Sequence, residues 1–199
     1  MTQLILASWN PGKSREMRAL LMPLDVEIID AAQMETSLQI DEIGETYAEN
    51  ASLKARIFAE QFQMWTIGDD TGLEVDALDG APGLRSARLT GPGSSDVDRR
   101  THLLSLLEPH PSPWTARFRC VVAFAGSEGM IGLAEGSCEG EIIPVERGKG
   151  GFGYDPIFLI TGLGRTMAEI SAEEKNRVSH RARAIRALFP TLKAHLGSG

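Results

Sequence analysis

The chain has 199 residues, of which 42% are hydrophobic and 24% charged, and its formal net charge is −7. This composition is ordinary for a globular protein, and the length suits one domain or two small lobes around one core. The negative balance argues against general binding of DNA or RNA, which depends on neutralising phosphates with Lys and Arg, but local basic residues and a metal would still permit a small polyphosphate.

The cysteines and the N-terminus place further limits on the protein. Cys120 and Cys138 belong to no CxxC or Cys/His cluster, so a zinc site is not expected, and a reduced intracellular chain is favoured over a disulfide. The N-terminus lacks the basic region of a signal peptide, and no stretch approaches the ~18 apolar residues of a membrane span. We therefore expect a cytoplasmic protein that has no nucleic-acid or membrane partner.

Apolar runs and helical spacings mix along the chain, which predicts an α/β fold with a mixed sheet. The Thr46–Glu49 capping box starts the second helix, and the Gly- and Pro-rich segment 80–93 is expected to be loop. The expected strands are 3–8, 26–29, 64–67, a run ending at Leu78, 117–125, 130–143 and one from 157; the expected helices are 14–21, 46–62, 98–107 and the C-terminal part.

The stretch IGDDTGLEVDAL places two adjacent acids, Asp69 and Asp70, where an apolar run ends at Gly68. Adjacent carboxylates repel, and burying them unpaired costs several kcal/mol. One interpretation is a solvated turn, because Asp and Gly favour turns. The other is a site for a hard cation such as Mg²⁺, which prefers carboxylate oxygens, with Asp41 or Glu42 alongside.

The segment ASWNPGKS, residues 7–14, reads as a strand, a loop and a helix start with Lys13 at the turn. Helix amides, the helix dipole and a lysine together suit a phosphate. The spacing is one residue short of a P-loop, and Trp9 and Pro11 make a nest of consecutive amides hard to build. The alternative is an ordinary strand-to-helix turn.

The glycine-dense segment GKGGFGYDPIF permits close approach of backbone to a ligand. Phe152 or Tyr154 offers a ring on which a base can stack, and Asp155 offers a carboxylate for a positive partner or a sugar hydroxyl. The alternative is a flexible connection between strands.

In SAEEKNRVSHRARAIR, Lys175 and His180 are five residues apart, or ~140° around an unbroken helix. They would then point in different directions, as on a continuous solvated helix. A break near Val178 would instead place His180 and Arg181 in the first turn of a new helix. Positive side chains oppose the dipole there, which makes sense if an anion or an electron-rich base edge binds.

The four segments together resemble the Ham1-like nucleoside-triphosphate pyrophosphatases, also called inosine triphosphate pyrophosphatases or XTP/dITP diphosphatases. The resemblance runs from Leu4 to about Leu188. No single motif is specific, but the set is specific through its order and spacing. The motifs are SWNPGK from Ser8, ENASLKA from Glu49, DDTGLEVDAL from Asp69, GAPGLRSAR from Gly80, GGFGYDPIF from Gly150 and EEKNRVSHR from Glu173.

The resemblance implies a single domain over residues 1–199, an α/β fold with a mixed, elongated sheet, flanking helices and two lobes with a ligand cleft between them. It implies a Mg²⁺-dependent homodimer that cleaves ITP, dITP, XTP and dXTP to the monophosphate and pyrophosphate. The roles it implies are substrate binding for Ser8, Trp9, Asn10, Pro11, Gly12, Lys13, Thr71, Phe152, Gly153, Tyr154, Asp155, Lys175, His180 and Arg181, metal binding for Asp70 and Glu42, and proton acceptance for Asp70.

The chain departs from the family pattern at two places. Family members often have Thr-Gly-Asn where this chain has Ser8-Trp9-Asn10, and Ser where this chain has Thr71. Thr71 keeps the hydroxyl, whereas Trp9 is large enough to alter the entrance to the cleft.

Selection of the substrate is expected at the purine 6-position, where hypoxanthine and xanthine present an oxo acceptor and adenine an amino donor. A site with donors at that edge rejects the wrong partner strongly, and the candidate donors are His180, Arg181 and loop amides near Phe152. Two alternatives stay open: a P-loop-type nucleotide kinase and a nucleotide-binding protein without catalysis.

Overall fold

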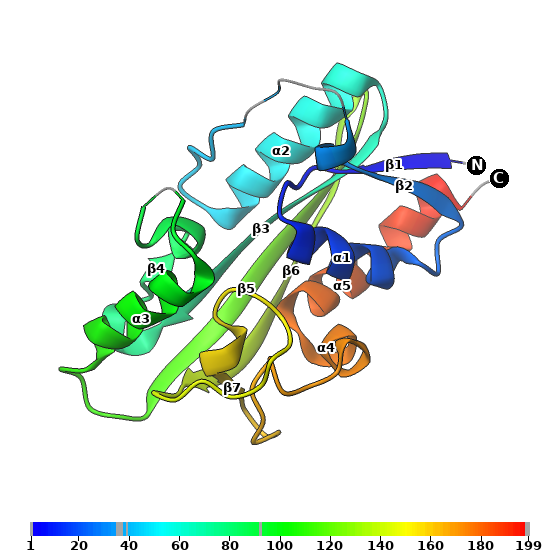
Figure 1. Cartoon of the computed structure of the whole chain (residues 1–199). Coiled ribbons are helices and arrows are strands. Elements are labelled where there is room, and N and C mark those ends of the chain that lie inside the picture. The colour runs from blue at the N-terminus through cyan, green and yellow to red at the C-terminus, as the bar shows by residue number, and fades with distance from the viewer. Residues whose placement is uncertain (1, 35–37, 39, 92, 198–199) are drawn as a thin grey trace. The chain divides into compact units, whose positions relative to one another are not determined.

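The computed structural model describes residues 2–34, 38, 40–91 and 93–197. Its helices are α1 (Pro11–Leu21), α2 (Tyr47–Phe62), α3 (Asp96–Leu107), α4 (Ala172–Val178) and α5 (His180–Leu196), shown in Figure 1. Its strands are β1 (Thr2–Leu6), β2 (Val26–Asp30), β3 (Trp65–Val75), β4 (Pro82–Gly83), β5 (Trp114–Gly126), β6 (Gly129–Ile142) and β7 (Phe158–Ile160). Short 3₁₀ turns lie at Ala31–Gln33, Asp76–Leu78, Ser86–Arg88 and Asp155–Ile157.

The strands form a mixed sheet in the order β2-β1-β3-β5-β6-β7, with β4 paired to β3. Strand β1 runs parallel to β2, with Leu4 opposite Ile28, and parallel to β3, with Leu4 opposite Trp65. Strands β4 and β7 pair antiparallel with β3 and β6. The predicted α/β class with a mixed sheet is therefore confirmed.

The chain divides into two compact units. Unit 1 comprises residues 1–70, 120–136 and 180–199, and unit 2 comprises residues 71–119 and 137–179. Strands β3, β5 and β6 contribute residues to both. Each unit has its own hydrophobic core, as described next.

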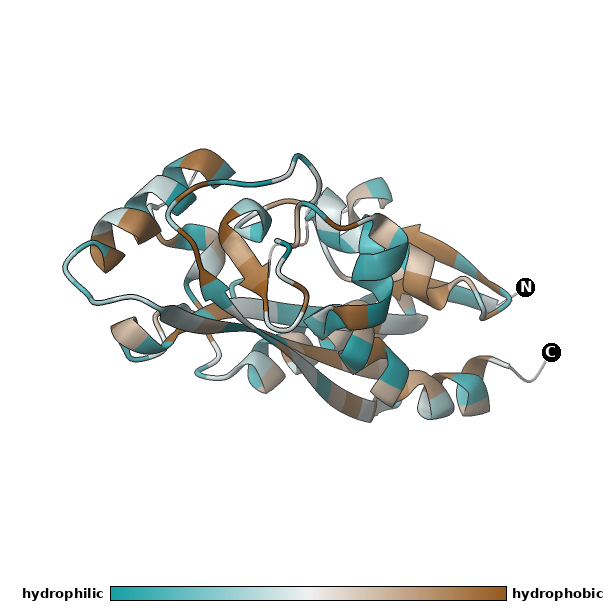
Figure 2. Ribbon diagram, turned by 90° about the horizontal axis from the view of Figure 1, so that it is seen from below, coloured by the Kyte–Doolittle hydropathy of each residue, from teal (hydrophilic) through white to brown (hydrophobic). Residues whose placement is uncertain are grey.

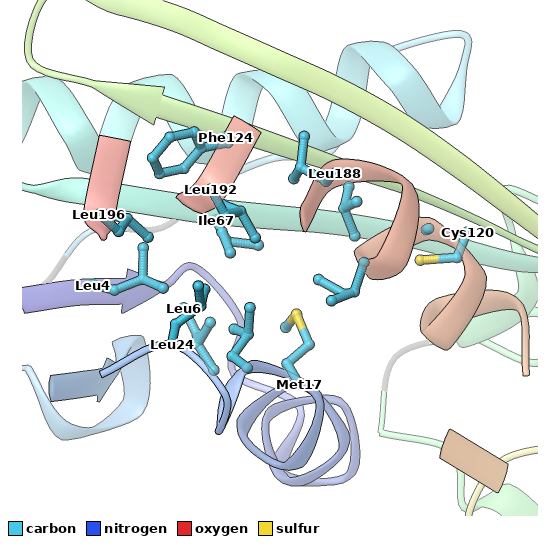
Figure 3. Close-up of a cluster of buried hydrophobic side chains, with 14 residues drawn as sticks. Leu4, Leu6, Met17, Leu24, Ile67, Cys120, Phe124, Leu188, Leu192 and Leu196 are labelled. Atoms are coloured by element: carbon cyan, nitrogen blue, oxygen red, sulfur yellow. The ribbon is translucent and has the colours of Figure 1, made fainter. Parts of the chain in front are cut away.

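The core of unit 1 is built from the strands β1, β3 and β5 and the inner faces of α1 and α5 (Figure 3). The side chains of Leu4, Ile67 and Leu192 are fully buried in it, and each contributes roughly 1.5–3 kcal/mol relative to exposure to water. Helix ribbons in Figure 2 alternate between hydrophilic and hydrophobic bands, as expected for helices that bury one face.

The core of unit 2 gathers apolar residues from β3, α3, β5, β6 and β7 and from the segments around Tyr154 and Met167. Phe118 and Phe158 pack ring against ring in this core, with centroids 4.6 Å apart. Cys138 is buried here and Cys120 is buried in the core of unit 1, and both thiols are free. The two thiols lie in different cores, so the structure does not pair them.

Three predicted boundaries were wrong in an informative way. Helix α1 begins at Pro11, three residues before the predicted start, because Asn10 caps it and proline suits the first helical position. Strand β3 continues from Trp65 to Val75 without the predicted interruption at the paired acids. The last strand begins at Phe158, after a 3₁₀ turn over Asp155–Ile157.

The predicted break near Val178 is confirmed. Helix α4 ends at Val178, Ser179 has extended backbone angles (φ −68°, ψ 158°), and α5 begins at His180. The alternative of one continuous basic helix is therefore wrong. Among the described residues, no helix combines the length and the apolar character needed to cross a membrane.

Candidate active site

The two adjacent acids lie inside strand β3, where neighbouring side chains point to opposite faces of the sheet. Asp69 is 0% exposed and Asp70 5% exposed, so the solvated-turn interpretation is wrong. Asp69 shares its face with Ile67 of the unit 1 core, and Asp70 meets α2 on the other face. The alternation of the strand thus separates two carboxylates that would otherwise repel at short range.

Asp69 is held between two cations. Its Oδ2 lies 3.1 Å from Lys13 Nζ and 3.2 Å from Arg181 Nη2. Burial alone would raise the pKa of Asp69, but Lys13 and Arg181 outweigh it and hold that pKa well below its usual range. Arg181 is 1% exposed and also donates to Glu16 on α1, so Asp69, ionised at neutral pH, links α1, β3 and α5.

Asp70 has a different environment on the α2 face. The Asn50 amide donates to its Oδ2 at 3.0 Å. Burial raises the pKa of Asp70 above its ordinary value, and the nearby Glu42 adds to this; Lys54, Lys13 and the Asn50 bond oppose it but do not cancel it. A carboxyl group whose charge is disfavoured in the free protein is suited to accept a proton or to bind a cation.

Lys54 links this second face to the acidic segment before α2. Its Nζ lies 2.6 Å from Glu42 Oε1, and the residue is 6% exposed. Burial lowers the pKa of Lys54, but Asp69, Glu42 and Asp70 outweigh it, so the pKa is raised and the ammonium stays charged. The expectation had left Asp41 and Glu42 open, and the contact with Lys54 together with the charge coupling to Asp70 favours Glu42.

Two glycines allow helices to lie directly on the strands at this site. A Cβ at Gly68 would stand 2.4 Å from the Ala51 carbonyl oxygen, so α2 touches β3 one residue before the acidic pair. A Cβ at Gly136 would stand 2.3 Å from the His180 carbonyl oxygen, so the start of α5 touches β6. These close approaches bring Lys54 and Arg181 to opposite faces of the same strand.

The start of α1 differs from the phosphate-binding turn that the sequence suggested. The Asn10 side chain accepts the amide protons of Gly12 and Lys13 at 2.9 and 3.1 Å, and its carbonyl accepts the Ser14 amide. Pro11 has no amide proton. The first-turn amides are therefore used within the protein, and Lys13 is the group here that can bring charge to a phosphate.

Ser8 and Trp9 precede this cap. Ser8 is 7% exposed, and its Oγ accepts the Asn10 amide proton at 3.3 Å. Trp9 is 44% exposed and packs edge-on against Phe58 of α2, with centroids 5.5 Å apart. The large residue thus rests on α2 rather than pointing freely into water.

The predicted base-binding residues form a second group, in unit 2. Lys175 Nζ lies 2.5 Å from Asp155 Oδ2, with both residues at or below 5% exposure, and 4.9 Å from the centroid of the Phe152 ring. The Phe152 amide donates to Asp155 at 2.8 Å. Of the two uses suggested for Asp155, it serves the positive partner, and the pair supports one side of the Phe152 ring.

Tyr154 cannot supply the stacking ring that was considered for it. Its side chain is 4% exposed in the core of unit 2, and its hydroxyl donates to the Ser86 carbonyl at 2.8 Å. Phe152 is half-buried and is the ring of this segment that remains suited to a base. Thr71, next to Asp70 on β3, is half-buried and is the first residue of unit 2.

The structure therefore gathers the predicted residues into two groups. Unit 1 holds Ser8 to Lys13, Glu42, Asp70, His180 and Arg181; unit 2 holds Thr71, Phe152 to Asp155 and Lys175. The sequence interpretation missed Glu16, Asn50 and Lys54. The missed signal is the segment ENASLKA, in which Asn50 and Lys54 lie four apart on a helix face that also carries the buried alanines Ala51 and Ala55.

Two carboxylates, Asp70 and Glu42, could contribute to a divalent-cation site. Among the described residues, no group of three or more Asp, Glu, His or Cys side chains forms a metal site. Asp70 and Glu42 are close enough for Glu42 to raise the pKa of Asp70, and a cation would relieve that repulsion. Mg²⁺ commonly takes one or two carboxylates and completes its shell with waters and substrate phosphates, so this pair fits it.

A groove of about 780 Å³ lies beside α1 and β2 in unit 1, bordered by Trp9, Arg15, Arg18 and Gln33. Its lining contains neither acid of the β3 pair, and neither Lys13 nor Lys54. Arg18 there is engaged by Asp30 at 2.7 Å. The acid–ammonium chemistry therefore lies outside this groove.

The fold and the paired carboxylates with their ammonium partners define an α/β protein with a buried, charged candidate site on strand β3. The chain belongs to the Ham1 family, whose model matches residues 4–191.

Known relatives and solved structures agree with this assignment. A dITP/XTP pyrophosphatase from Desulforamulus reducens is 45% identical over 191 residues, 96% of this chain and 95% of the relative. Another from a Nostoc species is 46% identical over 196 residues, 98% and 96% of the two chains. The structure of a HAM1 protein from Coxiella burnetii matches with a TM-score of 0.87, 38% identity and coverage of 98% and 100%. The structure of the Staphylococcus aureus Ham1 protein matches with a TM-score of 0.85 and 36% identity, and the match covers 97% of this chain and 99% of that one.

Proposed function

We propose that this protein hydrolyses non-canonical purine nucleoside triphosphates (ITP, dITP, XTP and dXTP) to the nucleoside monophosphate and pyrophosphate. The observation that carries the proposal is the split environment of the two β3 acids. Asp69 is neutralised by fixed cations, and Asp70 is buried with a raised pKa beside Glu42 and Lys54. Membership of the Ham1 family and the names of the relatives support the substrate class.

The triphosphate is assigned to the unit 1 group. Residues Ser8 to Lys13 and Lys54 would face it, and the Lys13 ammonium, fixed by Asp69 at 3.1 Å, supplies a placed charge. Asp70 and Glu42 would hold Mg²⁺. When bound, Mg²⁺ neutralises phosphate charge and lowers the pKa of a coordinated water.

Asp70 is assigned as the general base that accepts the proton of the attacking water. In hydrolysis at the α-phosphorus, the water oxygen forms a bond to that phosphorus. The bond from the α-phosphorus to the oxygen that bridges the α- and β-phosphates breaks, and pyrophosphate leaves in line with the attack. Asp70 Oδ takes the water proton. A general base works best with a pKa near the working pH, and burial beside Glu42 shifts the pKa of Asp70 in that direction. Lys54, a charged ammonium beside Asp70 and Glu42, is placed to stabilise negative charge on the transferring group.

The purine base is assigned to the unit 2 group. Phe152 would stack on the purine, with Gly153, Tyr154 and Asp155 shaping the loop and Thr71 contacting the substrate. The Phe152 amide donates to Asp155, and the Gly153 amide donates to Asp96. Because both amide protons are already used within the protein, these amides are poor candidates for donors to the purine 6-oxo group.

The side-chain donors for the 6-oxo edge can also be narrowed. Arg181 is buried between Glu16 and Asp69, so it would act on the base edge only by giving up one of these contacts. Lys175 carries three donor protons, so holding Asp155 and meeting an oxo acceptor are compatible. Lys175 in unit 2 and His180 in unit 1 therefore remain the side-chain candidates for donating to the 6-oxo group.

One assay tests the function. Wild-type protein with Mg²⁺ should convert dITP to dIMP and pyrophosphate, with ATP cleaved far more slowly. Asp70→Asn should lower turnover about 10²–10⁴-fold, the usual contribution of a general base, while retaining the fold. Full activity in Asp70→Asn would remove Asp70 as the base, and equal rates on ITP, GTP and ATP would refute recognition of the base edge.

The products separate the alternatives. A nucleotide kinase would yield the diphosphate and a phosphorylated acceptor, and a binding protein would bind dITP without turnover. The kinase alternative is disfavoured because a P-loop binds phosphate through consecutive amides, whereas here the first amides of α1 are taken by Asn10.

We also propose a cytoplasmic homodimer, on the basis of the family resemblance. The measured mass of the protein in solution tests the dimer; a monomer at working concentrations would refute it.

A further inference from the structure

Two side chains of helix α3 are hydrogen-bonded to the backbone of the segment that carries Phe152. The Gly153 amide donates to Asp96 Oδ2 at 2.7 Å, and the Gly153 carbonyl accepts from Arg100 Nη1 at 2.8 Å. Both backbone polar groups of one residue are thus held by side chains one helical turn apart on α3. All of these residues belong to unit 2.

Arg100 is itself fixed in place. Its Nε and Nη2 donate to the two carboxylate oxygens of Glu146 at 2.7 and 3.0 Å, and the residue is 7% exposed. Two-point contacts between guanidinium and carboxylate restrict geometry as well as adding strength. The Arg100 proton that reaches Gly153 therefore has a defined position.

Asp96, the second α3 side chain that holds Gly153, is also ionised. Burial would raise the pKa of Asp96, but the Gly153 amide, Arg99 and Arg100 outweigh it and lower that pKa. Asp96 therefore remains an acceptor at neutral pH. A charged acceptor makes a stronger hydrogen bond to an amide than a neutral one does.

Gly153 needs such restraint because of its backbone conformation. Its φ is +62°, and a Cβ there would meet nothing within 4 Å, so no packing against a side chain fixes this position. Glycine reaches positive and negative φ about equally readily. A change of φ at Gly153 would reorient the peptide that joins it to Phe152, although the Phe152 carbonyl also accepts the Asp155 amide proton at 3.2 Å. Lys175 contacts the ring of Phe152.

We propose that Asp96, Arg100 and Glu146 are positioning residues for purine recognition: through Gly153 they fix the orientation in which the Phe152 ring receives the base. They act through Gly153, to which Asp96 and Arg100 are hydrogen-bonded. The inference rests on the proposed function for its ligand, a 6-oxopurine nucleotide, and on the unit 2 contacts alone for its geometry.

The test compares four proteins in a matched set. Arg100→Met removes the bonds to Glu146 and Gly153 while keeping an unbranched side chain. The exchange Arg100→Glu with Glu146→Arg restores an ion pair but presents an acceptor to the Gly153 carbonyl. Arg117→Met is the control, because Arg117 pairs with Asp76 at 2.6 Å elsewhere in unit 2. Wild type completes the set.

Two readouts do not require turnover. Backbone hydrogen exchange of segment 148–157 in the nucleotide-free protein should be about tenfold or more faster in Arg100→Met, the effect of losing a charge-assisted hydrogen bond. Inosine monophosphate should bind about tenfold more weakly to that variant, with its preference over adenosine monophosphate reduced. The charge exchange should recover thermal stability but neither exchange protection nor affinity, and Arg117→Met should lower thermal stability alone.

The outcomes separate the proposal from its alternatives. Unchanged exchange in Arg100→Met, or full recovery of protection and affinity by the charge exchange, would show a merely structural ion pair. Failure of wild type to bind inosine monophosphate would overturn the positioning role. A wild type that binds the monophosphate but cleaves no triphosphate would refute the proposed function while leaving the positioning role standing.

Discussion

Replacing either acid of the β3 pair with Asn makes the same chemical change at neighbouring positions, yet the structure predicts different effects on stability. Asp69 is fully buried between Lys13 and Arg181. Removing one member of a buried ion pair costs roughly 3–5 kcal/mol, and we expect the lower value because Arg181 keeps Glu16. At about 2–4 °C per kcal/mol for a chain of this size, Asp69→Asn should lower Tm by about 6–12 °C.

Asp70→Asn should leave Tm unchanged or raise it slightly. The raised pKa of Asp70 means that its negative charge is less favourable in the folded protein than in the unfolded chain. The substitution removes that charge, keeps the shape, and leaves an oxygen that can still accept a hydrogen bond from Asn50. The variant should lose activity without losing stability.

The pH dependence gives the comparison a sign. Because the folded pKa of Asp69 is lowered, its stabilisation is complete above the ordinary value of 3.8 and is lost as pH falls below it. The Tm difference between wild type and Asp69→Asn should therefore shrink in acid. For Asp70 the folded pKa is raised, so its destabilising effect develops as pH rises from 3.8 through the folded pKa, and any gain in stability from Asp70→Asn should appear only above that range.

Thermal unfolding of the three metal-free, nucleotide-free proteins, from pH values below 3.8 up to pH 8, measures these differences. Hydrolysis of dITP by the same preparations, supplied with Mg²⁺ at neutral pH, shows whether activity follows stability. Equal losses of stability for Asp69→Asn and Asp70→Asn would refute the division of the pair into a fixed structural acid and a reactive one. An Asp69→Asn variant as stable as wild type at pH 7 would do the same.

Further predictions concern α2 and the acidic segment before it. Gly68→Ala should cost about 1–3 kcal/mol through overpacking and lower activity, because its Cβ would press on the Ala51 carbonyl; Gly132→Ala, whose Cβ would meet the flexible tip of Leu188 at 3.0 Å, should cost less when both are compared by denaturant unfolding. Glu42→Gln should raise the Mg²⁺ concentration needed for half-maximal hydrolysis about tenfold or more, as loss of a supporting carboxylate does, whereas Asp41→Asn should not; equal metal requirements would exclude Glu42 as the ligand. Lys54→Met should lower kcat by about 10²–10³-fold, the effect of losing one charge-stabilising group, and kinetics close to those of wild type would leave Lys54 a purely structural role.

Local signals in the sequence determined much of the fold. The Thr46–Glu49 capping box set the start of α2, and apolar periodicity located α3, β5 and β6 to within a few residues. Such signals act between near neighbours, so they can be read without knowing the rest of the structure. The start of α1 was misplaced because a proline was read as loop although Asn10 caps the helix in front of it.

The candidate site was predicted by residue type but not by arrangement. Asp69 and Asp70 stood out as a costly pair, and Lys13, Lys175, His180 and Arg181 as charges in need of partners. Their contacts, however, join residues up to 165 positions apart, as between Arg181 and Glu16. No local pattern encodes such a distance.

The sequence by itself determined the α/β class, the capped helices and the presence of two adjacent acids beside lysine- and glycine-rich segments, because these follow from propensity and near-neighbour contacts. Only the tertiary structure decided that β3 runs unbroken through the acids, so that Asp69 turns to Lys13 and Arg181 while Asp70 turns to Asn50. The physical reason is that ladder pairing and burial on both faces fix the strand, and the alternation of its side chains then gives two identical residues different electrostatic surroundings.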